Sequence, residues 1–108
     1  MKHIKITLVF LLIVSCTIMD RNKNIEFNQV LEDYFQESLY LYKINGTFQG
    51  DPRYNDSLPN FLSDEFVKKE ELFYNKFLKK INSFDNSLLN EEELLSKNVL
   101  KWECEMNL

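Results

Sequence analysis

Few residues of this chain could carry nucleophilic or metal-binding chemistry. The 108-residue sequence has one histidine, His3, and two cysteines, Cys16 and Cys104. Two cysteines exclude a disulfide framework and a Cys₄ zinc site, and two glycines leave no glycine-rich loop to cradle a phosphate. If residues 1–15 are removed as a targeting segment, His3 is lost with them. The mature chain then has no imidazole for Ser–His, Cys–His or His-ligated metal chemistry.

Cys16 ends a segment with the features of a lipoprotein signal. Lys2 and Lys5 give a basic start, and Ile6–Val14 form an apolar run broken only by Thr7. The run is about 9 residues long, within the 7–15 typical of a signal peptide and short of the roughly 18 that span a bilayer. It ends in Ile-Val-Ser-Cys, which resembles the bacterial lipobox, whose cysteine thiol receives the lipid. The alternative is an ordinary signal peptide or a buried apolar strand that contains a cysteine.

These features predict a signal peptide at 1–15, a lipidated tether at 16–24 and a helical segment at 25–108. An acylated Cys16 would anchor the chain to the membrane, since each buried CH₂ contributes about 0.8 kcal/mol. We therefore expect a location outside the cytoplasm, on the cell membrane or the outer membrane. Processing leaves 11 of the 13 basic residues against 17 acidic ones, so the formal charge changes from −4 to −6. This balance argues against nucleic acid as a partner.

Two acidic stretches are interpreted without a catalytic role. Consecutive side chains of a helix point in different directions, so the run Glu91–Glu93 cannot converge on one ion and is predicted to be a solvated first turn. Cys104 lies between Glu103 and Glu105, whose negative charges disfavour the thiolate. We expect its thiol to be inert or partly buried.

Loop 46–59 is the stretch with most room for a binding site. It holds both prolines and both glycines, and connections of this length tend to be functional or packed by another segment. Arg53, Tyr54 and Asp56 are the candidate residues for contact with a partner. The competing interpretation is a structural loop held by an Arg–Asp pair.

The spacing of apolar residues predicts an all-α fold with about three amphipathic helices, at roughly 25–45, 63–84 and 90–107. Gly46 is the expected C-terminal cap of the first helix. The apolar positions of this helix recur at intervals of three and four: Phe27, Val30, Leu31, Tyr34, Phe35, Leu39 and Tyr42.

The second helix is expected to begin after Ser63 as N-cap, with a hydrophobic staple between Leu62 and Val67. Its predicted buried residues are Phe66, Val67, Phe73, Tyr74, Phe77, Leu78, Ile81 and Phe84.

The third helix has the clearest start signal, because Asn90 as N-cap and Glu93 three residues later form a capping box. Leu89 is placed to staple to Leu94. The predicted apolar stripe of this helix runs through Leu95, Val99, Trp102 and Met106. The sequence stops two residues after this stripe, which suggests an interrupted helix.

Three segments carry a resemblance to a known family: Leu31-Glu-Asp-Tyr-Phe35, Gly50-Asp-Pro-Arg-Tyr-Asn-Asp-Ser-Leu-Pro59 and Leu88-Leu-Asn-Glu-Glu-Glu-Leu-Leu95. Over residues 25–106 the chain resembles the N-terminal part of a large bacterial lipoprotein family of uncharacterised function with a mostly helical, zinc-peptidase-like fold. The resemblance implies a downstream His-Glu-x-x-His helix that binds zinc, with a glutamate as general base. No position of this chain matches that motif, so no catalytic, metal-binding or cofactor-binding residue is carried over.

The leading hypothesis is a lipidated N-terminal helical piece of a peptidase-like lipoprotein without catalysis of its own, either a remnant or a subunit completed by a second polypeptide. The alternative is a complete small helical lipoprotein that binds a partner through loop 46–59. An enzyme in its own right would need carboxylate-only chemistry, and no Asp/Glu pair stands in a recognisable setting. The sequence therefore predicts no enzyme and no cofactor.

Overall fold

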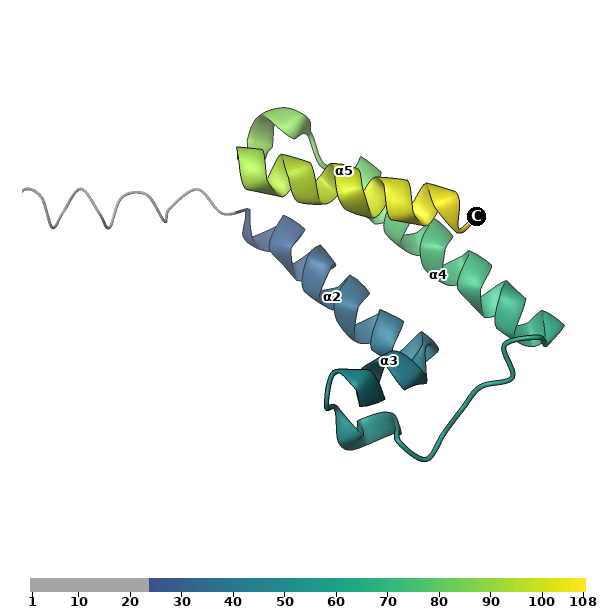
Figure 1. Ribbon diagram of the computed structural model, residues 1–108. Coiled ribbons are helices and arrows are strands. Elements are labelled where there is room, and N and C mark those ends of the chain that lie inside the picture. The colour runs from purple at the N-terminus through teal and green to yellow at the C-terminus, as the bar shows by residue number, and fades with distance from the viewer. Residues whose placement is uncertain (1–23) are drawn as a thin grey trace, which may run out of the picture.

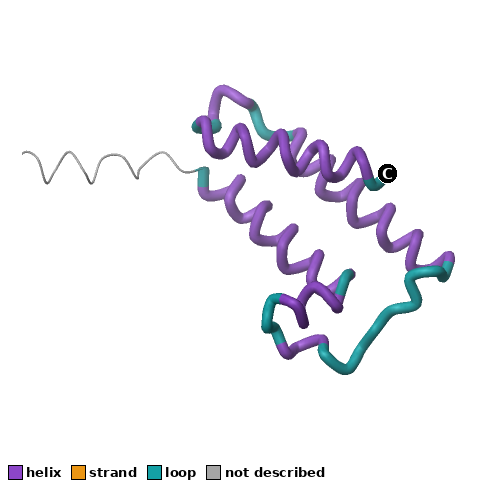
Figure 2. Tube along the Cα trace, in the orientation of Figure 1, coloured by secondary structure: helices purple, strands orange, loops and turns teal. Residues whose placement is uncertain are grey.

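The computed structural model describes residues 24–108, and within them every regular element is helical (Figures 1 and 2). The prediction of an all-α fold is confirmed. The predicted signal peptide, Cys16 and all of the tether except Asn24 lie outside the described residues. No helix in the described range is long and apolar enough to cross a bilayer. The elements are α2 (Ile25–Leu41), α3 (Lys43–Phe48), η1 (Pro52–Tyr54), α4 (Asp64–Asn82), η2 (Asn86–Leu88) and α5 (Glu91–Met106).

Helix α4 packs against both α2 and α5, and it runs partly behind α5 in the view of Figure 1. The contacts between α2 and α4 show that these helices are antiparallel: Asp33 pairs with Lys80, whereas the later Glu37 pairs with the earlier Lys76. Helices α4 and α5 form a hairpin through η2. Both α2 and α5 therefore pack on α4.

The core lies along α4. Phe77 and Ile81 are fully buried, and the Phe77 ring lies 5.2 Å from the Tyr34 ring of α2 and 5.1 Å from Phe73. Such tilted and edge-to-face ring pairs add to the stabilisation from burial. The buried cluster comprises Val30, Phe73, Tyr74, Phe77, Ile81, Leu100 and Cys104.

The first helix does not end at Gly46 as predicted. It breaks at Tyr42, and the chain continues as α3 through Gly46, which is buried. A Cβ on Gly46 would lie 3.2 Å from Cδ2 of Tyr54, so a larger residue here would require the Tyr54 ring to shift by a few tenths of an ångström. Gly50, with φ 77°, is the glycine that takes the left-handed turn. The first half of loop 46–59 is thus folded as α3 and η1.

The start of α4 agrees with the sequence at its cap and differs at its staple. Ser63 is the N-cap, and its Oγ accepts a hydrogen bond from the Phe66 amide at 3.2 Å. Leu62 and Val67 are both exposed, so the predicted staple between them is wrong. The residue before Leu62 makes the contact instead: the ring of Phe61, which stays partly exposed, packs 5.0 Å from that of Phe66.

The predicted capping box of α5 is confirmed, and its glutamate has a further role. The Glu93 amide donates to Asn90 Oδ1 at 2.9 Å, and Glu93 Oε2 accepts from the Asn90 amide at 3.1 Å. Glu93 Oε1 also accepts from the Asn24 amide at 2.6 Å and from Asn28 Nδ2 at 2.8 Å. The prediction of a solvated acidic turn is therefore right for Glu91 and Glu92 and wrong for Glu93, which is buried and joins the starts of α2 and α5.

The apolar stripe predicted for α5 is on the wrong face. The helix buries Leu100, Cys104, Glu93 and Lys97 against the rest of the fold. Lys97 can be buried because its Nζ donates to the Phe84 carbonyl at 2.6 Å and to Asn86 Oδ1 at 2.8 Å. We call the opposite side the outward face of α5; its exposed apolar residues are Leu95, Val99, Trp102 and Met106.

Candidate functional site

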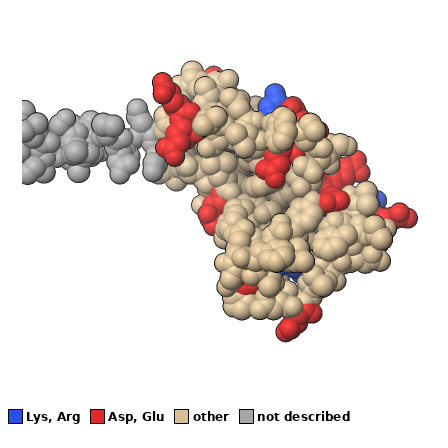
Figure 3. Space-filling view, in the orientation of Figure 1, with Lys and Arg blue, Asp and Glu red and all other residues tan. Residues whose placement is uncertain are grey.

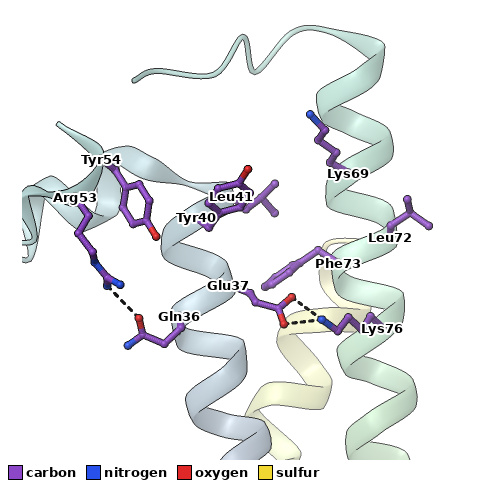
Figure 4. A pocket seen from close by; sticks show the side chains of 10 residues that line it. All are labelled: Gln36, Glu37, Tyr40, Leu41, Arg53, Tyr54, Lys69, Leu72, Phe73 and Lys76. Carbon is purple, nitrogen blue, oxygen red and sulfur yellow. Dashed lines mark hydrogen bonds and ion pairs between the residues drawn. The ribbon is translucent and has the colours of Figure 1, made fainter. Parts of the chain in front are cut away.

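A groove lies between α2, η1 and α4, with a volume of about 500 Å³. We call it the α2/α4 groove (Figure 4). Phe73 lies at its base and is nearly buried, whereas Tyr40 and Leu72 are about two-thirds exposed, at 66% and 63%. The groove is lined by Gln36, Glu37, Tyr40, Leu41, Arg53, Tyr54, Lys69, Leu72, Phe73 and Lys76.

The turn η1 places Arg53 and Tyr54 beside α2. Asp51 caps this turn by accepting a hydrogen bond from the Arg53 amide at 3.0 Å. The Arg53 guanidinium donates from Nε to both oxygens of Asp51 and from Nη2 to Gln36 Oε1 at 3.0 Å. The Tyr54 ring lies 6.2 Å from the Tyr40 ring in an edge-to-face arrangement. These contacts hold residues 51–54 against α2, where they form one wall of the groove.

Cations lie around the apolar part of the groove, and each has an acidic neighbour. Lys69 Nζ lies 2.7 Å from a carboxylate oxygen of Glu65, and Lys76 pairs with Glu37 across the groove (Figure 4). The hydrogen bond from Arg53 lowers the pKa of Asp51, and Asp51 in turn raises the pKa of Arg53. Among the charged residues that line the groove, three are basic and one, Glu37, is acidic, so the groove combines apolar surface with an excess of basic side chains in its lining.

The structure brings together two of the three residues that the sequence singled out. Arg53 and Tyr54 line the groove, whereas Asp56 is exposed and does not. The competing interpretation, a loop held by an Arg–Asp pair, also agrees with the structure, in which Arg53 pairs with Asp51. Tyr40 and Leu72 also line the groove and were not predicted as site residues from the sequence. Their signal was present, because both are large apolar residues that fall outside the helical stripes.

A second, polar hollow of about 410 Å³ lies among α2, α4 and α5. Tyr42 Oη donates to Glu70 and lies 2.9 Å from Tyr74 Oη. Burial raises the pKa of Tyr42 and Tyr34, and the neighbouring carboxylates of Glu70 and Glu103 raise it further. These phenols remain protonated near neutral pH, so they connect the helices by hydrogen bonds and do not act as bases.

Alkaline pH is expected to destabilise the fold. Burial raises the pKa of the Cys104 thiol from 9.0 to about 11 and also raises the pKa of Tyr34, Tyr42 and Tyr74. Because these groups lose protons more readily in the unfolded chain, stability is intact below pH 9 and falls as the pH rises above it. Thermal melts followed by circular dichroism should give a falling Tm between about pH 9 and 11. Tyr42→Phe should make this fall shallower; an unchanged or rising Tm would contradict the burial of these groups.

The two cysteines allow a direct count of reactive thiols. Cys104 is fully buried, and a lipidated Cys16 would be a thioether with no thiol. Chain purified from membranes should therefore show no thiol that reacts with Ellman's reagent when folded and one when denatured. Two thiols after denaturation would contradict lipidation of Cys16, and rapid reaction of the folded protein would contradict burial of Cys104.

Within residues 24–108, no group of three or more His, Cys, Asp and Glu side chains is arranged to hold a metal ion. No protein-family model matches the chain, and neither a curated protein sequence nor a solved structure is significantly similar to it.

Proposed function

We propose that this chain is a lipid-anchored helical binding module, without catalysis of its own, that holds a segment of a partner polypeptide in the α2/α4 groove. The observation that carries the proposal is that Arg53 and Tyr54 line the same groove as the exposed side chains of Tyr40 and Leu72. A volume of about 500 Å³ falls within the range of small-ligand sites and accommodates a few side chains.

The chemistry of the groove favours an acidic segment with apolar side chains. Apolar side chains would cover Tyr40 and Leu72, which remain largely open to solvent. Carboxylates of the partner would share Lys69, Lys76 and Arg53 with the carboxylates that already pair with them, and the excess of basic over acidic residues in the lining favours association and the correct register. Lipid on Cys16 supplies the membrane anchor in this proposal and places the module outside the cytoplasm.

Site-specific photocrosslinking in the native host tests this function. A photoreactive residue at Leu72, within the groove, should give a discrete crosslinked product, and the same residue at Leu62 should not. Leu62 is a matched position because it is 93% exposed and lies outside the groove. Lys69→Glu should reduce the product severalfold, while Lys68→Glu, the same charge change outside the groove, should leave it unchanged. Equal yields from both crosslinking positions, or none from Leu72, would contradict the proposal.

A second candidate function is a helical piece of a peptidase-like lipoprotein that a second polypeptide completes. The outward face of α5 favours this candidate, because apolar side chains in a row along a helix normally pack against another element. Sequencing the DNA beyond the codon of Leu108 tests the peptidase-like form of this proposal. A downstream reading frame that encodes a His-Glu-x-x-His helix supports it, and the lack of such a frame contradicts it.

A further inference from the structure

Helix α5 carries apolar residues on two sides, and only one side is used by the described fold. Leu100 and Cys104 face the core and are 4% and 0% exposed. The outward face, by contrast, is 55–66% exposed at each of its four residues. Those residues lie at i, i+4, i+7 and i+11, which places them in a single row about 16 Å long. The row is long enough to contact about three turns of another helix.

The outward face also borders a groove between α2 and α5. This hollow has a volume of about 380 Å³, and Leu95 and Val99 form one side of it while Leu31 of α2 forms the other. An element lying along α5 would therefore contact apolar side chains of two helices. Such a groove between helices is the kind of surface that takes the apolar face of an amphipathic helix.

Acidic side chains border this surface. Residues three and four apart are neighbours on a helix, so Glu91 and Glu92 flank Leu95, and Glu103 flanks Val99. Glu105 flanks Trp102 in the same way. Of the two lysines of α5, Lys97 is buried, and Lys101 has no such neighbour in the row and pairs with Glu105 at 3.7 Å. Figure 3 shows more acidic than basic side chains on the face of the molecule where α2 and α5 are in front.

We infer that the outward face of α5 docks a basic amphipathic helix of a partner polypeptide, with apolar residues at helical spacing and Lys or Arg on both flanks. The acidic border disfavours a second copy of this chain, because a two-fold contact through this row would bring the same glutamates towards one another. It likewise disfavours an anionic membrane surface. The inference rests on the second candidate function, a helical piece completed by another polypeptide, and does not depend on the α2/α4 groove.

Trp102 is the single tryptophan of the sequence and lies in this row, so its fluorescence reports occupancy directly. The experiment uses the full-length chain in phosphatidylcholine nanodiscs and two synthetic tryptophan-free helical peptides, about 20 residues long. Both peptides have a leucine stripe; one has lysine flanks and the other glutamate flanks. The lysine peptide should shift Trp102 emission to the blue and bind at least about tenfold more tightly than the glutamate peptide at low salt. The difference should vanish at about 1 M salt.

Variants separate the contributions of the row and its border. Val99→Glu should abolish the shift, whereas Val67→Glu, a valine of nearly equal exposure on α4, should leave it unchanged. Joint replacement Glu92→Lys and Glu105→Lys should reverse the preference between the two peptides.

Four outcomes would overturn the inference. Equal binding of both peptides would contradict the preference for a basic helix but would remain compatible with the second candidate function. Binding of neither peptide would contradict both the inference and the second candidate function. A blue shift that grows with protein concentration in the absence of peptide would show that a second copy of this chain covers the outward face of α5. Quenching of Trp102 by brominated phosphatidylcholine in the nanodisc would assign it to the bilayer.

Discussion

Phe77→Ala is expected to lower the free energy of unfolding by about 3–5 kcal/mol, the loss typical of removing a fully buried phenylalanine. Phe77 has no exposed surface, and its ring packs against Tyr34 of α2 and against Phe73. The substitution removes apolar burial and leaves a cavity at the junction of α2 and α4. Because small domains are only marginally stable, this single change should bring the fold close to unfolding.

Urea unfolding of a soluble form that begins at Thr17 measures this effect. Val67→Ala is the matched control on the same helix, since Val67 is 54% exposed. It should change the free energy of unfolding by less than about 0.5 kcal/mol. The hydrophobic pattern alone predicts burial of both side chains. Similar losses of unfolding free energy for the two variants would therefore agree with that pattern and contradict the exposure of Val67 in the structure.

Glu93→Ala is expected to cost about 3 kcal/mol, since charge-assisted hydrogen bonds are strong and their buried donors are costly to leave unpaired. The carboxylate accepts from the Asn24 and Asn90 amides and from the Asn28 side chain. Its loss removes the contact between the first turns of α2 and α5. We therefore expect amide hydrogen exchange to accelerate first at the start of α2.

Two variants define the role of the Glu93 carboxylate. Glu93→Gln retains an oxygen that can accept from α2 and should cost less than Glu93→Ala. Glu92→Ala removes a neighbouring exposed carboxylate and should have little effect. If Glu92→Ala and Glu93→Ala were equally mild, Glu93 would belong to a solvated acidic turn, as its sequence context alone suggests.

The features that the sequence predicted correctly are those that depend on neighbouring residues. Ser63 and the Asn90–Glu93 pair cap their helices through contacts three residues away, so their signals are local. The break at Tyr42 has no such local signal, and the burial of Gly46 beside the Tyr54 ring depends on another turn of the chain. The all-α class could be predicted from the sequence, but the division of the first predicted helix into α2 and α3 could not.

The faces of the helices were harder to predict because tertiary contacts decide them. Charged residues are normally found at the surface, yet Lys97 and Glu93 are both buried with hydrogen-bond partners from other segments. Their burial turns the four-residue apolar row of α5 towards solvent. At the candidate site, loop composition indicated Arg53 and Tyr54. Tyr40 and Leu72 belong to two different helices, and only the packing of α2 on α4 brings them to the same groove.

The two proposed binding surfaces differ in charge. The lining of the α2/α4 groove has three basic residues, Lys69, Lys76 and Arg53, and one acidic residue, Glu37, whereas glutamates border the outward face of α5. Surfaces bordered by charges of opposite sign favour different partners through charge complementarity. A membrane-anchored module with this distribution would hold an acidic segment at one surface and a basic helix at the other.

The environment of Trp102 tests most directly whether α5 presents its apolar row to solvent. The measurement is the fluorescence emission and acrylamide quenching of the soluble form at low protein concentration, before and after unfolding in urea. With Trp102 63% exposed, the folded chain should already emit like a solvated indole and be quenched readily, with little change on unfolding. A blue-shifted, protected emission that moves to the red in urea would show that the row is buried and would contradict the exposed outward face of α5.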